Sequence, residues 1–148
     1  LLENNRELKT LFDAQIKEFP KIIKDLENNY KDDHWIWYVF PNSRSGANAS
    51  FKIKLDKNDF QDYVYYLNKV KPILLDNWIV IIQKILLIGQ NRGLINSGFG
   101  SDIGRIIYCL SKSKGEWNYF INKDHIDEKV QKFKVLLKKF QDNFEKIN

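Results

Sequence analysis

The sequence predicts an all-α fold, a compact single domain over residues 1–148 with six to seven helices around a buried central helix. Three observations predict it. Apolar residues recur at helical spacing in most segments of the chain. Residues 73–88 are apolar on nearly all sides, as a buried helix would be. No segment that alternates between apolar and polar residues is followed by a convincing partner strand. With 148 residues, of which 43% are hydrophobic, the chain can bury a sizeable core.

The N-terminal segment predicts two helices separated by a proline. Proline cannot continue a helix without losing a hydrogen bond, but it suits the first turn of a new one. We therefore expect one helix to end near Pro20 and a second to run from Lys21 to Asn29. The apolar face of the first helix is formed by Leu8, Leu11, Phe12, Ile16 and Phe19.

The segment Asp33–Asn42 contains two of the four tryptophans and one of the two histidines. Its aromatic density predicts a short buried helix, for which Asp32 or Asp33 would accept hydrogen bonds from the free N-terminal amides. Pro41 disfavours helical geometry at the residue before it, so this helix should end near Phe40.

A loop rich in small polar residues, 42–50, follows the aromatic segment. The alternation in Lys52–Leu55 leaves a short strand open as an alternative to irregular structure. Asp56 is then expected to cap a helix whose buried face carries Phe60, Val64 and Leu67.

The predicted central helix starts at Pro72, runs over residues 73–88 and stops at Gly89. Its few polar residues and its length argue against a membrane span. A second loop, from Asn91 to Asp102, leads into an apolar helix over residues 103–110. Residues 112–115 should then form a turn.

The last apolar residues step by four and three positions, the clearest helical stripe in the chain. The stripe predicts a C-terminal helix that either packs on the domain or forms a homodimer seam. Its apolar seam is narrow and acidic residues stand among its lysines, so no membrane contact is expected. Its members are Ile126, Val130, Phe133, Leu137, Phe140, Phe144 and Ile147.

Composition excludes several classes of function. The net charge of +5 is spread along the chain, which does not predict a specific nucleic-acid surface. One cysteine and two distant histidines cannot assemble a usual zinc site, and no cofactor motif is present. Cys109 lies in an apolar run and is expected to be an inert core thiol. The first residues do not resemble a secretory signal, so we expect an intracellular protein, cytoplasmic or nuclear.

The candidate ligand-binding residues come from the aromatic helix and the two loops. Aromatic rings can stack on a base, arginines can pair with phosphate, and a helix N-terminus attracts anions. If the two loops meet, one cleft would be lined by His34, Trp37, Asn42, Arg44, Ser101, Asp102 and Arg105. No catalytic residue is assigned.

Two motifs resemble those of the domain-of-unknown-function 1810 family. They are Phe12-Asp13-Ala14-Gln15 and His34-Trp35-Ile36-Trp37-Tyr38-Val39-Phe40-Pro41. Phe99-Gly100-Ser101-Asp102 and Arg105 resemble a later segment of the family. The sequence departs from the family pattern at Asn42, where a Gln is usual, in the loop that follows, and at Arg105, where a Lys is usual. The resemblance implies a small helical protein and no known activity.

Three kinds of function remain open on these observations. The first is a module that binds a small anionic, nucleotide-like ligand between the two loops. The second is an enzyme that acts on such a ligand with His34 as acid or base. The third is a protein-interaction module that uses the C-terminal helix. Binding is favoured because the sequence offers stacking and cationic groups but no pair of nucleophile and base.

Overall fold

The computed structural model describes residues 2–28, 36–41, 57–92, 102–113 and 115–144, which form helices and turns only. A short 3-10 turn, Leu2–Asn4, precedes the first helix. The α-helices are α1 (Arg6–Glu27), α2 (Ile36–Val39), α3 (Lys57–Val70), α4 (Pro72–Arg92), α5 (Asp102–Leu110), α6 (Asn118–Ile121) and α7 (Glu128–Phe144). The prediction of an all-α domain is confirmed.

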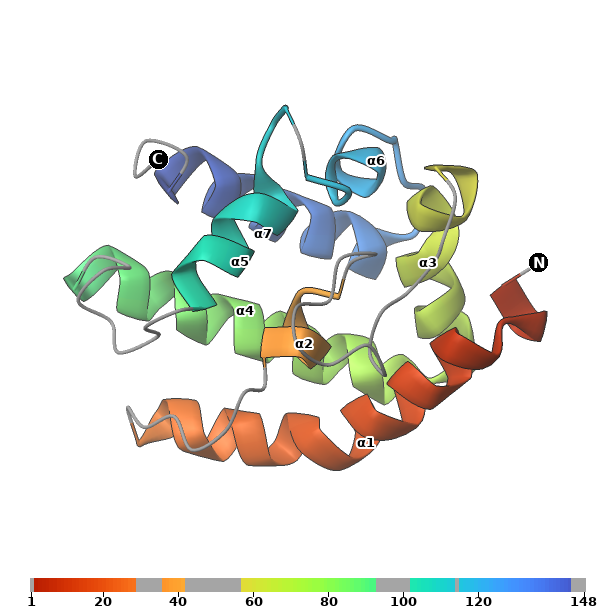
Figure 1. Ribbon diagram of the computed structural model, residues 1–148, viewed down its shortest axis with the longest axis horizontal. Coiled ribbons are helices and arrows are strands. Elements are labelled where there is room, and N and C mark those ends of the chain that lie inside the picture. Colours follow the sequence, from red (N-terminus) through yellow and green to blue (C-terminus); the bar gives the residue numbers. More distant parts are fainter. Residues whose placement is uncertain (1, 29–35, 42–56, 93–101, 114, 145–148) are drawn as a thin grey trace.

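Helix α4 is the central helix, as its sequence predicts. It crosses the middle of the molecule between α1 on one side and α5 and α7 on the other (Figure 1), and it contacts α1, α2, α3 and α7. Among the described helices, α4 alone is long and apolar enough to cross a membrane, but about half of that stretch is buried inside the domain. The side chains of Leu75, Trp78, Ile81, Ile82 and Ile85 are fully buried. Packing by other helices explains its apolar composition.

Helix α1 is continuous, so the prediction of two helices separated at Pro20 is wrong. Pro20 lies inside the helix with its ring exposed to solvent. Phe19 before the proline and Ile22 and Leu26 after it form one continuous buried face. An internal proline costs about 3 kcal/mol, and burying three large apolar side chains at about 1.5–3 kcal/mol each outweighs that cost. The helix bends along its length (Figure 1), as a missing hydrogen bond allows.

Gly89 does not stop the central helix, contrary to the prediction. Helix α4 continues to Arg92, with Gly89 buried within it. Asn91 and Arg92 are therefore helical and do not belong to the second loop. A glycine inside a helix costs only about 1 kcal/mol relative to alanine, so packing on both sides can carry the helix through it.

The other helix boundaries follow the sequence closely. Helix α2 ends at Val39, just before Phe40 and Pro41, as the proline predicts. Helix α3 buries Phe60, Val64 and Leu67 on one face. The predicted helix over residues 103–110 is α5, which begins one residue earlier. The predicted cap Asp56, the loop 42–50 and the possible strand at Lys52–Leu55 lie outside the described residues.

The C-terminal stripe packs on the domain over most of the described part of α7. Val130, Phe133, Leu137 and Phe140 are buried in the common core. Ile126 is an exception and is fully exposed, because Asp127 begins the helix by accepting a hydrogen bond from the Val130 amide at 3.0 Å. Ile126 therefore precedes the cap and does not share the helical face. The side chain of Phe144 and all of Ile147 lie outside the described structure.

Candidate functional site

Four consecutive carbonyl groups at the end of α2 each accept a hydrogen bond from a different part of the chain. The amide of Gln15 in α1 donates to Tyr38, at 2.8 Å. The indole of Trp78 in α4 donates to Val39, at 3.0 Å. The thiol of Cys109 in α5 contacts the Phe40 carbonyl at 3.4 Å, and the indole of Trp117, just before α6, donates to Pro41 at 3.1 Å. We call these residues, 38–41, the carbonyl hub.

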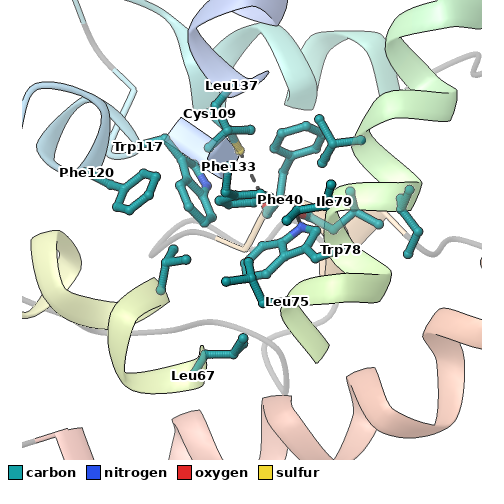
Figure 2. Close-up of a cluster of buried hydrophobic side chains, with 14 of the residues drawn as sticks. Phe40, Leu67, Leu75, Trp78, Ile79, Cys109, Trp117, Phe120, Phe133 and Leu137 are labelled. Carbon is teal, nitrogen blue, oxygen red and sulfur yellow. Dashed lines mark hydrogen bonds between the residues drawn. The ribbon is translucent and has the colours of Figure 1, made fainter. Parts of the chain in front are cut away.

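The carbonyl hub provides hydrogen-bond partners for the carbonyl groups at the end of α2. The last carbonyls of a helix have no partner within it, and leaving them unpaired in a dry core is costly. Val39, Phe40 and Pro41 are buried, so solvent water does not supply hydrogen bonds to their carbonyl groups. Side chains from distant segments supply the donors. Figure 2 shows Phe40 and Cys109 in the same core cluster as Trp78, Trp117 and Phe133.

The rings around the hub form one continuous aromatic cluster. Trp78 packs on Trp117 edge to face, with ring centroids 5.5 Å apart, and Phe133 lies 4.9 Å from Trp78. Phe60 meets Trp117 edge to face at 5.2 Å. Edge-to-face pairs add stability beyond the burial of apolar area. Both tryptophans are fully buried, so their indole N–H groups depend on the hub carbonyls as hydrogen-bond acceptors.

Two polar atoms beside the hub lack a hydrogen-bond partner in the described structure. They are Oε1 of Gln15 and the hydroxyl of Tyr63, and both side chains are fully buried. Burial raises the pKa of Tyr63 far above its ordinary value, and the neighbouring Gln15 side chain opposes part of that rise. No hydrogen bond of acceptable geometry joins the two atoms. Tyr63 is therefore a neutral core residue and not a candidate acid or base near pH 7.

The predicted ligand-binding residues fall largely outside what the structure describes. His34, Asn42, Arg44 and Ser101 are not among the described residues. Trp37 lies in α2 and Asp102 opens α5, but the structure describes only the helical positions of both. The convergence of the two loops therefore remains a prediction. Arg105 is the one predicted residue whose side chain is described.

Arg105 lies on α5 with its guanidinium partly enclosed. The side chain is half-buried, and its Nε and Nη2 atoms are buried. Cys109 stands four residues later, so both side chains project from the same face of the helix. Because the Cys109 thiol reaches the Phe40 carbonyl, this face is turned toward the segment that follows α2. Helices α2 and α5 are in contact, which places the backbones of Trp37 and Arg105 on neighbouring elements.

Cys109 is the inert core thiol that the sequence predicts. It is fully buried and not in a disulfide. A thiol that donates to a carbonyl is protonated, and an apolar setting disfavours the reactive thiolate. Within the described part of the chain, no group of three or more His, Cys, Asp or Glu side chains is arranged to hold a metal ion.

Sequence reasoning missed a groove between α3 and the link that joins α6 to α7. The groove has a volume of about 440 Å³ and is lined by Asp62, Tyr65, Lys123, Asp124, His125, Ile126 and Asp127. His125 lies in the link just before α7. In the structure its Nε2 atom lies 2.9 Å from the Phe120 carbonyl, and its ring packs on Phe120 with centroids 4.3 Å apart. We call this the His125 groove.

One signal in the sequence could have revealed the groove. Residues 122–125 form a polar run between the apolar end of α6 and the cap of α7. Asp127 stands three positions before Val130, the spacing of a side-chain cap. A side-chain cap sets the residue at which a helix begins, and this restricts the conformation of the residues just before it. Which side chains of α3 face this link depends on tertiary packing and has no local signal.

A comparison with known families bears on the two motifs. The chain matches the family described as protein of unknown function (DUF1810) over residues 5–93, which is more than half of its length. The match covers Gln15 and the hub, and ends before Ser101 and Arg105, where the resemblance stays a prediction. No curated protein and no solved structure matches the chain. The protein is thus a member of the DUF1810 family.

Proposed function

We propose that the protein binds a small anionic, nucleotide-like ligand between α2 and the N-terminal turn of α5. The observation that carries the proposal is the enclosure of the Arg105 guanidinium on the face of α5 turned toward the aromatic segment. A guanidinium that is partly shielded from solvent binds phosphate or carboxylate strongly and in a defined geometry.

The placement of Arg105 within α5 supports an anion in the same place. Arg105 belongs to the first turn of the helix, three residues after Asp102. The amides of a helix N-terminus carry partial positive charge, so a cationic side chain there adds to an existing positive field. Both the guanidinium and these amides would attract an anion. Trp37, on the neighbouring helix, would supply the ring on which a base stacks.

The remaining residues of the proposed site come from the sequence. His34, Asn42 and Arg44 flank α2 in the chain. Ser101 precedes α5, and Asp102 is its first residue. The two loops therefore start from helices that are already in contact. The proposal assigns binding and no reaction. If the site is also catalytic, His34 is the candidate acid or base.

Calorimetric titration of the purified protein with AMP, ATP and inorganic phosphate tests the proposal. We expect saturable binding of at least one nucleotide. Arg105→Lys keeps the charge but loses the planar fork, so binding should weaken while the melting temperature stays close to that of the parent. Arg92→Ala, at the end of α4, is the matched control and should bind normally. Chromatography of the titrated samples would detect turnover.

Two results would overturn the proposal. One is the absence of saturable binding for all three probes. The other is binding that Arg105→Lys leaves unchanged in a folded protein, which would move any anion site away from α5.

A further inference from the structure

The imidazole that lines the His125 groove is held by a hydrogen bond. A carbonyl oxygen can only accept hydrogen bonds, so the Nε2 atom that faces the Phe120 carbonyl carries the hydrogen. In the neutral ring, Nδ1 is then a hydrogen-bond acceptor, and none of the described residues hydrogen-bonds to it. Burial is the main cause that lowers the pKa of His125, and Lys134 and Lys123 add to it. The neutral form therefore prevails near pH 7.

The two lysine ammonium groups beside the groove already have partners within the protein. The ammonium of Lys123, from the link, is paired with Asp62 of α3. The ammonium of Lys134, from α7, donates to the Lys123 carbonyl at 2.7 Å and lies 3.8 Å from the Asp124 carboxylate. Neither lysine is left to receive an anion.

The hydrogen-bond acceptors of the groove are in surplus. The Asp124 side chain is fully exposed, and its one ion pair, with Lys134, is long. Asp127 uses Oδ1 for the Val130 amide and, at 3.5 Å, for Asn68. Nδ1 of His125 adds a further acceptor. A ligand that complements these acceptors must carry hydrogen-bond donors and positive charge.

The groove also has apolar walls that face solvent. Ile126 is fully exposed, and Tyr65 of α3 exposes 53% of its surface. An exposed aromatic ring beside carboxylates attracts a cation through its face as well as through apolar contact.

We propose that the His125 groove binds an organic cation, an ammonium or guanidinium group carried on an apolar body. The cation would contact Asp124 and Nδ1 of His125, and its apolar part would lie on Tyr65 and Ile126. The group can belong to a free amine or to the side chain of a lysine or arginine in a peptide. This site is independent of the anion site at α5, because the two involve different elements and opposite charges.

Nuclear magnetic resonance of the labelled full-length protein tests this inference near pH 8, above the ordinary pKa of histidine of about 6.5. The probe is benzylamine, and benzoate is a control of the same size and opposite charge. N-acetyl-lysine methylamide is the second probe and separates the two sources of the cation. We expect saturable shifts of the His125 and Ile126 signals with benzylamine and none with benzoate. A lysine derivative that binds more tightly than benzylamine indicates a peptide ligand, and the reverse indicates a free amine.

Surface variants localise the site without disturbing the core. Asp124→Asn removes an exposed carboxylate and should weaken benzylamine about fivefold, the upper range for one exposed ion pair. Tyr65→Ala should weaken it about two- to fivefold. The matched controls are Asp142→Asn on α7 and Tyr119→Ala on α6, both exposed, which should leave the affinity unchanged.

The pH dependence gives a further check. The groups that face His125 are Asp62 and Tyr65 from α3, Lys134 from α7, the Phe120 carbonyl from α6, and Lys123 and Asp124 from the link. Protonation of His125, once the pH falls below its lowered pKa, removes the Nδ1 acceptor and adds a positive charge, so benzylamine binding should weaken toward acid pH. The inference is wrong if benzoate binds as well as benzylamine, if both site variants bind normally, or if no shift saturates on the order of 10 mM probe.

Discussion

Gln15 shows how a single polar residue connects two sequence motifs. It ends the first motif, and its amide donates to Tyr38 within the second. A fully buried glutamine is uncommon, and here its value lies in the hydrogen bond that it supplies to the carbonyl hub. Gln15 and Tyr38, one residue from each motif, thus have a role in folding.

The substitution Gln15→Glu tests this role with a side chain of the same shape. A carboxylate would face the Tyr38 carbonyl as a second acceptor, so we expect a loss of about 3 kcal/mol or more in the free energy of unfolding near pH 7. Burial raises the pKa of the introduced carboxyl above its unfolded value, so the folded state binds more protons and stability recovers as the pH falls. Urea unfolding at several pH values measures both effects.

Gln15→Met is the matched control for that experiment. It has similar length but neither donor nor charge, so it should cost about 1–3 kcal/mol for the unpaired carbonyl. Its loss should not depend on pH. A Gln15→Glu protein as stable as the parent near pH 7 would show that the amide does not donate to Tyr38.

At the scale of the element, the turn after α5 requires glycine. A Cβ atom at Gly115 would lie 2.4 Å from the Cys109 carbonyl oxygen and 2.8 Å from the Ser111 nitrogen. Both are backbone atoms, so no side-chain rotation relieves the clash. Trp117 follows two residues later and donates to the hub. We expect Gly115→Ala to lower the free energy of unfolding by about 1–3 kcal/mol or more.

Thermal unfolding followed by tryptophan fluorescence measures that effect. The control is Ser113→Ala, exposed in the same turn, which should change stability by no more than about 0.5 kcal/mol. Equal melting temperatures for both variants would mean that the turn shifts freely and that Trp117 is held by its ring contacts alone.

The sequence predicted elements with a clear apolar period and missed those decided by tertiary packing. The faces of α3 and α7 are strongly periodic, and the described residues confirm both predictions except at Ile126. Pro20 and Gly89 are local breakers, but the helices run through them because buried faces continue on both sides. The hub could not be predicted, because its donors come from positions 15, 78, 109 and 117, far apart in the chain. Arg105 lies on a helix, as the apolar run over residues 103–110 predicts, whereas the groove at His125 was missed.

At the scale of the whole molecule, the family-matched segment depends on the rest of the chain. The match ends at residue 93, yet two of the four hub donors, Cys109 and Trp117, come later. Phe133 of α7 packs against both Trp78 and Trp117. All the buried apolar residues of the described helices belong to one cluster. Residues 5–93 should therefore not form a stable domain alone.

Removal of α7 tests that dependence directly. A chain ended at residue 127 loses Val130, Phe133, Leu137 and Phe140, which are buried in the core. The loss of one large buried apolar side chain costs about 2–5 kcal/mol. The loss of four is therefore comparable to or larger than the usual free energy of unfolding of a domain, about 5–15 kcal/mol. We expect the shortened chain to lack a cooperative thermal transition and the near-ultraviolet circular dichroism of packed tryptophans. A chain ended at residue 144 keeps all of α7 and should retain both. A shortened chain that melts cooperatively as a monomer would show that α7 is an accessory to the fold and would make its apolar face available to a partner.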